Sequence, residues 1–98
     1  MPKYVLLYQG GTMPQSPEEG EKTMAAWMAW FGAAGSAVLD MGNAFGPATA
    51  VGAALPDSGT NGYTTLEAAD VDAVKGLLSD HPHLAAGGRI EIHETTAM

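Results

Sequence analysis

The sequence predicts an α+β fold, a ferredoxin-like βαββαβ plait with a four-stranded antiparallel sheet and both helices on one of its faces. Three observations support this prediction: segments with the composition or alternation of strands, two segments with helical periodicity, and their order along the chain. Two right-handed crossovers in that order give the plait. The chain of 98 residues is expected to form a single domain, residues 1–98, with one core and a radius of gyration of roughly 13 Å.

The first and last segments are both predicted strands. Residues 3–9 are rich in β-branched and aromatic types and stop at Gly10-Gly11. Residues 89–94 alternate strictly between polar and apolar side chains, which is typical of a strand with two different faces. In a plait these two strands are neighbours.

Two helices are predicted from capping residues and periodicity. Ser16, Pro17 and Glu19 suit the start of a helix over residues 17–34. Its core stripe is expected to comprise Met24, Trp27, Met28, Phe31 and Gly35. Trp30 lies about 120° from that stripe, so we expect it to cover a loop or to line a cleft. Asp70 suits the start of a second helix, which is expected to end by Asp80, before Pro82.

The middle of the chain contains two further strands. Residues 37–41 are a predicted strand that ends at Gly42-Asn43, and residues 48–54 are a weak, Ala- and Gly-rich continuation. Residues 56–62 have the composition of a turn that forms a mobile surface tip, and residues 63–67 alternate as a strand does.

Alternation also assigns side chains to the two sheet faces. We expect the face under the helices to carry Val5, Leu7, Thr64, Leu66, Ile90 and Ile92. The opposite face is expected to show Tyr4, Leu6, Tyr8, Tyr63, Thr65, Glu67, Arg89, Glu91 and His93. A contiguous apolar patch of this kind is unusual on a monomer, so the sequence predicts a homodimer that pairs these faces.

Charge and composition exclude several classes of partner. The net charge of −7 disfavours nucleic acid and anionic membrane surfaces. The chain contains no Cys, which excludes disulfides and thiolate chemistry. The apolar run from Tyr4 to Tyr8 is too short for a signal segment or a membrane span, so we expect a cytoplasmic protein.

Three stretches together resemble the YCII-related proteins, a bacterial group also described by a D-G-P-F signature. They are Lys3-Tyr4-Val5-Leu6-Leu7-Tyr8, residues 35–47 (GSAVLDMGNAFGP), and Pro82-His83-Leu84 with Gly88-Arg89-Ile90-Glu91-Ile92. The resemblance implies a dimeric α/β barrel, in agreement with the bare face, and a mostly unassigned activity. It also implies a His on the first helix paired with an Asp near the second strand. Asp40 lies near the expected acid, but residues 24–31 contain no His.

The candidate catalytic pair is therefore His83 with Asp40. His titrates nearest neutral pH and can carry a proton, and His83 lies in the family-like Pro-His-Leu stretch. Asp40 would orient the ligand, with Trp30 as a flat apolar wall, although Asp40 also suits an Asx turn. His81 and His83 have no third ligand at a suitable spacing, so no metal site and no cofactor are expected, and loop capping or solvent exposure explains the pair.

A second candidate group lies on the predicted bare face. Glu91 and His93 share one face of their strand, and Tyr8 is expected opposite them. These groups would suit either acid–base chemistry or a polar dimer interface, with Arg89 neutralising the acids.

Two functions remain open. One is cofactor-free acid–base chemistry on a small organic molecule, and the other is a non-catalytic module that binds a small molecule. The pocket lies either between helices and sheet or inside the barrel.

Overall fold

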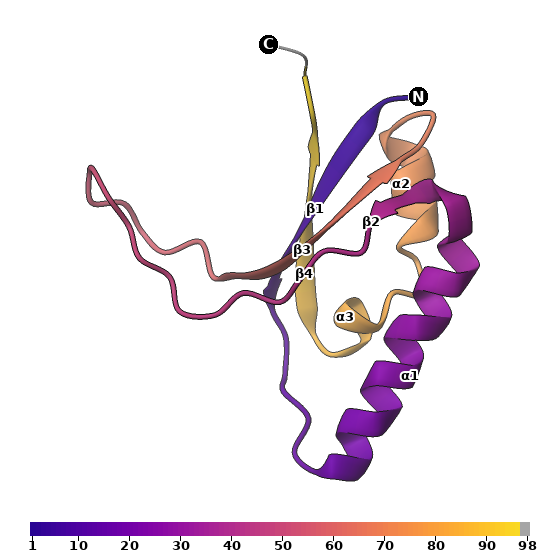
Figure 1. Ribbon diagram of the computed structural model, residues 1–98, viewed down its shortest axis with the longest axis horizontal. Coiled ribbons are helices and arrows are strands. Elements are labelled where there is room, and N and C mark those ends of the chain that lie inside the picture. Colours follow the sequence, from indigo (N-terminus) through magenta and orange to yellow (C-terminus); the bar gives the residue numbers. More distant parts are fainter. Residues whose placement is uncertain (97–98) are drawn as a thin grey trace.

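The computed structural model describes residues 1–96, and its element order confirms the predicted plait. The elements are β1 (Lys3–Gly10), α1 (Pro17–Ala34), the short 3₁₀ helix η1 (Gly35–Ala37), β2 (Val38–Asp40), β3 (Thr60–Glu67), α2 (Val71–Leu77), α3 (Pro82–Ala85) and β4 (Gly88–Glu94). The strands form one antiparallel sheet in the order β2-β3-β1-β4. The helices lie on one side of this sheet (Figure 1).

The two faces of β1 are the reverse of the prediction. Tyr4 pairs with Leu66 and Leu6 pairs with Thr64, and all four side chains are buried. Tyr8 is also buried. The side chains of Val5 and Leu7 therefore lie on the open face, because successive residues of a strand point to opposite sides.

This reversal has a physical reason. Both alternating sets of β1 are apolar or aromatic, so the pattern alone does not distinguish its faces. The tyrosines can be buried because each hydroxyl has a partner: Tyr4 donates to Glu94 at 3.2 Å, and Tyr8 lies 2.7 Å from the hydroxyl of Thr64.

The helix starts agree with the predicted capping residues. The Ser16 hydroxyl accepts the Glu19 backbone N–H at 3.1 Å, with Pro17 as the first residue of α1. Asp70 caps α2 by accepting the Ala73 N–H at 2.8 Å. Among residues 1–96, no helix is both long and apolar enough to cross a membrane.

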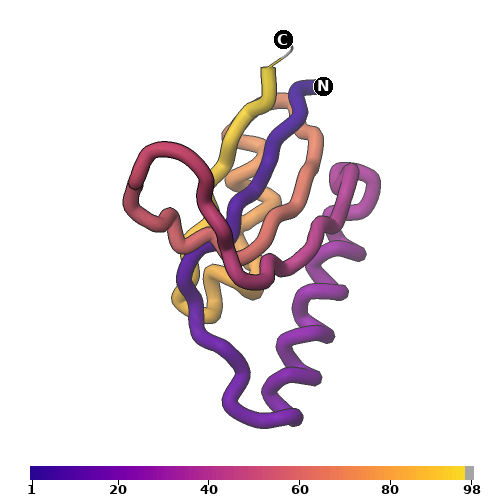
Figure 2. The backbone as a smooth tube through the Cα atoms, turned by 60° about the vertical axis from the view of Figure 1, so that its left-hand side comes forward, coloured from indigo at the N-terminus to yellow at the C-terminus, as the bar shows by residue number. Residues whose placement is uncertain are grey.

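The buried face of α1 differs from the predicted stripe. Trp30 is 5% exposed, whereas Met24 and Met28 are 63% and 54% exposed. The N-terminal half of α1 extends past the end of the sheet (Figures 1 and 2), and Met24 and Met28 border an open cavity and not the core. Trp30 therefore belongs to the core, and it does not cover a loop.

Residues 46–59 form an arm with no strand, so the predicted weak strand over 48–54 is wrong. The arm projects from the sheet on the side opposite the helices (Figure 1). Val51 is fully exposed and Leu55 is 82% exposed. The radius of gyration is 14.4 Å, larger than the roughly 13 Å expected for a compact chain of this length, as a projecting arm requires.

Candidate functional site

A large open cavity lies between α1 and the sheet. Its volume is about 1240 Å³, and it is bordered by α1, residues 10–14, residues 41–45, residues 59–63 and the start of α3. Most of its wall is apolar and includes Met24, Met28, Phe31, Met41, Phe45 and Tyr63. Tyr8, Trp27 and His83 also line it. An apolar cavity with few polar groups is the usual form of a small-molecule site.

His83 is fixed at this cavity by one hydrogen bond. Its Nε2 lies 2.9 Å from the backbone oxygen of Gln9. A carbonyl oxygen only accepts, so His83 Nε2 carries the proton. In the neutral ring Nδ1 is then an unprotonated acceptor. Nδ1 makes no hydrogen bond to any of the described residues. Among these residues every fully buried side-chain nitrogen or oxygen has a hydrogen-bond partner. Nδ1 of His83 is therefore not fully buried.

Two glycines make room for the His83 ring. A Cβ atom on Gly88 would lie 2.2 Å from Nε2 of His83, and one on Gly11 would lie 3.0 Å from Cε1 and 3.4 Å from Nδ1. The imidazole therefore occupies space that the side chain of any residue other than glycine at position 88 would fill. Gly11 also borders the cavity, next to the free nitrogen.

His81 lies behind His83 and is 1% exposed. Its Nδ1 accepts the backbone N–H of His83 at 3.0 Å, which caps the short helix α3. Burial and the neighbouring His83 lower the pKa of His81 from 6.5 to about 4, although Asp80 acts in the opposite direction. His81 is thus neutral at neutral pH, with its proton on Nε2.

A directed chain of hydrogen bonds starts at that proton. His81 Nε2 lies 3.3 Å from the Tyr8 hydroxyl, which lies 2.7 Å from the Thr64 hydroxyl. Thr64 donates to the backbone oxygen of Met41 at 2.9 Å, so its only proton is used there. Tyr8 therefore accepts from His81 and donates to Thr64. Burial raises the pKa of Tyr8, which keeps its phenol protonated.

The cavity brings together some of the predicted site residues. His83 and Tyr8 both line it, with ring centroids 5.3 Å apart. Trp30 and Asp40 do not line it. The Trp30 indole lies in the core against His81, so the expected convergence of His83, Asp40 and Trp30 on one concavity is not found.

Asp40 instead serves the local backbone. Its Oδ1 accepts the Gly42 N–H at 2.9 Å, which is the Asx turn considered from the sequence. Its Oδ2 accepts from the Tyr63 hydroxyl at 3.4 Å. These contacts shape the edge of β2 next to the cavity.

Glu91 and His93 share the open face of the sheet, as predicted. Glu91 is paired with His93 on one side and with Arg89 at 3.1 Å on the other. The hydrogen bond to His93 is the main reason why the pKa of Glu91 is lowered. Tyr8 points to the other face, so the predicted group of Glu91, His93 and Tyr8 does not form.

Several cavity residues were not predicted. His81 was identified only as a capping or exposed loop residue, and its burial depends on α1 and β1, which are distant in sequence. The exposed methionines of α1 were assigned to the core. Gly59, Asn61 and Gly62 line the cavity, although residues 56–62 were predicted to lie away from it. Residues 60–62 belong to β3, which brings them beside β1.

No cluster of three or more His, Cys, Asp or Glu side chains suitable for a metal ion is found within residues 1–96. His81 and His83 both have their protein-facing nitrogens in hydrogen bonds. The imidazole pair is thus part of the core and of the cavity wall.

The fold and the cavity define a small α+β plait protein with a largely apolar pocket that has the imidazole of His83 in its wall. No family model and no curated protein sequence matches the chain. A solved structure with this fold is 5-chloro-2-hydroxyhydroquinone dehydrochlorinase (TftG) from Burkholderia phenoliruptrix AC1100, in complex with 2,5-dihydroxybenzoquinone. The two chains are 21% identical with a TM-score of 0.55, over 95% of this chain and 93% of the other. This likeness establishes the fold.

Proposed function

We propose that the protein is a YCII-related enzyme that performs cofactor-free acid–base chemistry on a small, planar organic molecule, with His83 as the proton carrier. The observation that carries the proposal is the free Nδ1 of His83 at the cavity. Its opposite nitrogen is held by Gln9 at 2.9 Å, which leaves Nδ1 as the acceptor. A His base fixed through its other nitrogen is a common arrangement in catalysis.

The chemistry follows from this geometry. His83 Nδ1 takes a proton from an acidic carbon or hydroxyl of the substrate, and the Gln9 carbonyl stabilises the imidazolium through its Nε2–H. The same Nδ1–H then returns the proton to another position or to a leaving group. Tyr8 does not donate to the substrate, because its proton is directed to Thr64.

The walls of the cavity favour a planar and weakly charged substrate. The indole of Trp27 lies 6.4 Å from the imidazole of His83, and Phe45 and Tyr63 form a tilted ring pair at 5.8 Å. Aromatic walls of this kind suit a flat ring. The net charge of −7 disfavours a polyanion. The quinone bound by the fold neighbour is a molecule of this class.

The test uses 2,5-dihydroxybenzoquinone and hydroxylated aromatic compounds related to it as probes. Binding is measured by fluorescence titration of the tryptophans, and proton transfer by NMR detection of deuterium incorporation in D₂O. His83→Gln retains an N–H for the Gln9 carbonyl but lacks the base. It should bind the probe and lose exchange by at least about 100-fold. His93→Gln, which changes an imidazole outside the cavity, is the matched control and should retain full exchange.

Binding without any exchange that depends on His83 would contradict the enzyme proposal and favour the alternative, a binding module. An equal loss of exchange in His83→Gln and His93→Gln would also contradict the assignment of His83.

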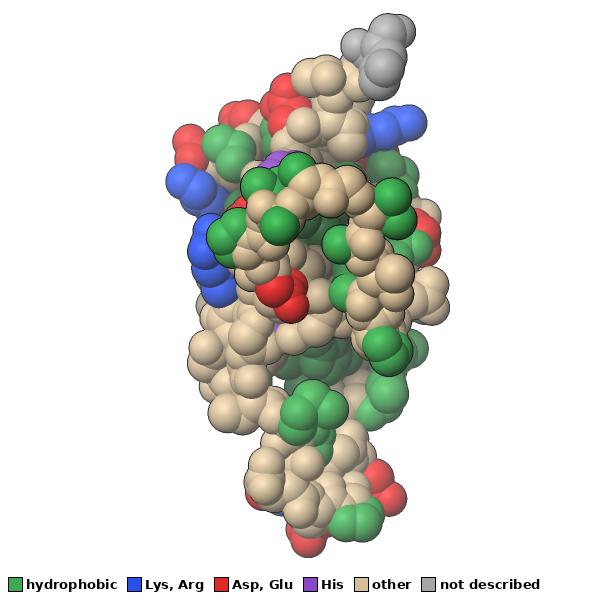
Figure 3. Space-filling view, turned by 90° about the vertical axis from the view of Figure 1, so that its left-hand side faces the viewer, with side chains coloured by type: hydrophobic (Ala, Val, Ile, Leu, Met, Phe, Trp, Pro, Cys, Tyr) green, Lys and Arg blue, Asp and Glu red, His purple; other side chains and the backbone are tan. Residues whose placement is uncertain are grey.

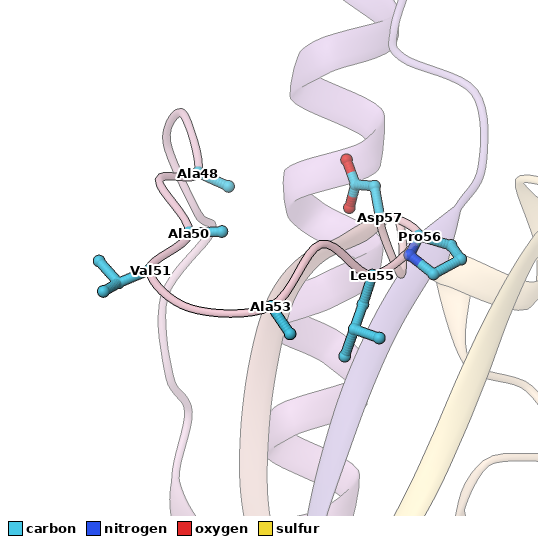
Figure 4. A pocket seen from close by; sticks show the side chains of 7 residues that line it. All are labelled: Ala48, Ala50, Val51, Ala53, Leu55, Pro56 and Asp57. Atoms are coloured by element: carbon cyan, nitrogen blue, oxygen red, sulfur yellow. The ribbon is translucent and has the colours of Figure 1, made fainter.

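We further propose that the working form is a homodimer that pairs the open sheet faces. Val5 and Leu7 lie half-buried on this face, and the apolar arm projects on the same side (Figures 1 and 3). The arm encloses a second hollow of about 420 Å³ lined by Ala53, Leu55 and neighbouring residues. In Figure 4, Val51 points away from the remainder of the arm into solvent. Apolar groups so arranged favour burial against a second subunit.

Light scattering tests this assembly. The expected mass is that of two chains of 10.1 kDa each. Leu7→Glu should give a single-chain mass, whereas Val71→Glu, an exposed position at the start of α2, should not change it. A single-chain mass for the unaltered protein would refute the dimer.

A further inference from the structure

We propose that His81 is a positioning residue for the cavity: one of its ring nitrogens holds His83, and the other holds a chain from Tyr8 through Thr64 to Met41. The inference deepens the proposed function and rests on its assignment of His83. It goes beyond that function because His81 itself does not line the cavity.

The first contact fixes His83. The backbone N–H of His83 belongs to the first turn of α3, where no carbonyl of the same helix can accept it. His81 Nδ1 accepts this N–H at 3.0 Å. Backbone hydrogen bonds from Leu84 and Ala85 to the His81 carbonyl also close this four-residue turn. The cap is the side-chain contact that fixes His83 itself, and with it the direction in which the His83 side chain leaves the backbone.

The second contact fixes the facing wall. With Nδ1 used as an acceptor, the proton of the neutral ring is on Nε2, which donates to Tyr8. The chain then continues through Thr64 to the carbonyl of Met41. Met41 begins the 41–45 segment, which lines the cavity. A neutral His81 thus links α3, β1, β3 and the end of β2.

The surroundings hold the His81 ring in place. Trp27 lies 4.6 Å and Trp30 lies 4.4 Å from it, measured between ring centroids. Both indoles come from α1, which also supplies one wall of the cavity. The charged or titratable groups near the ring are Tyr8 on β1, His83 on α3 and the adjacent Asp80. No described residue other than His83 and Tyr8 hydrogen bonds to it.

Three variants separate the two contacts. His81→Ala removes both. His81→Asn keeps an acceptor that can cap His83, since Asn is among the best capping residues, but it is too short to reach Tyr8. Thr64→Val breaks the chain between Tyr8 and Met41 and leaves α3 untouched. His93→Asn is the matched control, because it replaces an exposed imidazole.

The main readout is NMR of the free protein, which needs no ligand. In the unaltered protein the ¹⁵N shifts of both His81 and His83 should report the Nε2–H tautomer. His81→Ala should change the ring shifts of His83 and the amide shifts of residues 41–45. In His81→Asn the ring shifts of His83 should match those of the unaltered protein, whereas the amide shifts of residues 41–45 should still differ. Thr64→Val should change only the amide shifts of residues 41–45.

A second readout is the affinity for 2,5-dihydroxybenzoquinone. His81→Asn should weaken binding about 3- to 10-fold, the factor that corresponds to one lost hydrogen bond, and His93→Asn should leave it unchanged. If the probe binds neither the unaltered protein nor the variants, the proposed function fails. The NMR result still decides the role of His81 in that case.

The inference is overturned if His81→Ala leaves the His83 ring shifts and the amide shifts of residues 41–45 as they are in the unaltered protein. If His81→Ala does not fold, His81→Asn decides alone: unchanged shifts over residues 41–45 would refute the link to the wall, and a mixed tautomer at His83 would refute the cap.

Discussion

The indole of Trp30 lies against the imidazole of His81, with the ring centroids 4.4 Å apart. This contact joins the one fully buried side chain of α1 to the buried histidine that caps α3. Trp30 also donates its Nε1–H to the backbone oxygen of Leu77 at 2.8 Å. Trp30 therefore covers His81 together with Trp27 and attaches α1 to the end of α2.

The buried His81 should make stability depend on pH. Its pKa is lowered from 6.5 to about 4 in the folded protein, so between these values the unfolded chain binds a proton that the folded chain does not. Stability is therefore complete above about pH 6.5 and falls as the pH decreases to about 4, with a total loss of about 3 kcal/mol from this group. Urea unfolding at pH 7, 5.5 and 4.5 measures the change.

The control for this prediction is the same series with His81→Asn and His93→Asn. Carboxylates also titrate at acidic pH, so the decisive quantity is the difference between each variant and the unaltered protein. His81→Asn should have a flatter pH dependence, and His93→Asn should follow the unaltered protein. Parallel curves for His81→Asn and the unaltered protein would show that His81 does not titrate in this way.

Much of the fold could be predicted because its local signals agree with one another. Alternation assigned the faces of β3 and β4: in β4 one set is apolar and the other is polar, and in β3 Leu66 and Glu67 mark the buried and the open face. The same rule failed for β1, where Tyr4 and Leu6 alternate with Val5 and Leu7 and both sets are apolar. The register with β3 decides between them, and it depends on pairing across 50 or more residues of sequence.

The site was harder to predict, because burial at a helix depends on where the helix crosses the sheet. Periodicity placed Met24 and Met28 in the core stripe of α1 and Trp30 outside it. However, α1 contacts the sheet only along part of its length. The His-Pro-His stretch suggested a capped loop. Its role in the core follows from Trp27 and Trp30 on α1, which no local pattern connects to it.

Replacing Trp30 by a smaller aromatic residue should lower stability by more than the change in side-chain volume alone would, because a hydrogen bond is also lost. Trp30→Phe retains a ring but removes the donor from the partly buried Leu77 carbonyl, which costs about 1 kcal/mol. For a domain of this size that loss lowers the melting temperature by roughly 4–8 °C per kcal/mol. Met24→Leu, at a position 63% exposed, should change it very little. Thermal unfolding followed by circular dichroism compares the two variants, and equal melting temperatures would show that the hydrogen bond from Trp30 to Leu77 does not contribute to stability.

Removal of the Tyr8 hydroxyl should also lower stability. Tyr8→Phe leaves the Nε2–H of His81 buried without an acceptor, at a cost of about 1–3 kcal/mol. Tyr63→Phe is the matched control, because the Tyr63 hydroxyl makes only a long, exposed contact of 3.4 Å to Asp40. Chemical unfolding should show a clear loss for Tyr8→Phe alone. A similar effect of both substitutions would mean that the buried chain contributes nothing particular.

Gly11 and Gly10 offer a test of the access to His83 Nδ1. Both have positive φ, +87° and +66°, so alanine strains the backbone at either position by a similar amount. A Cβ at Gly11 would lie 3.0 Å from Cε1 and 3.4 Å from Nδ1 of His83, whereas a Cβ at Gly10 would meet no heavy atom within 4 Å. Gly11→Ala should therefore cover the free nitrogen, and Gly10→Ala should not.

The measurement is the binding of 2,5-dihydroxybenzoquinone together with the melting temperature of each variant. Both variants should lose stability because of the positive φ, and Gly11→Ala should lose more, because its Cβ also crowds His83. Only Gly11→Ala should also weaken binding, by about tenfold or more if contact with Nδ1 contributes as a hydrogen bond to a charged group does. Comparable affinities for the two variants, measured below the melting temperature of both, would mean that ligands do not approach His83 from the side of Gly11. The functional site would then lie on another wall of the cavity.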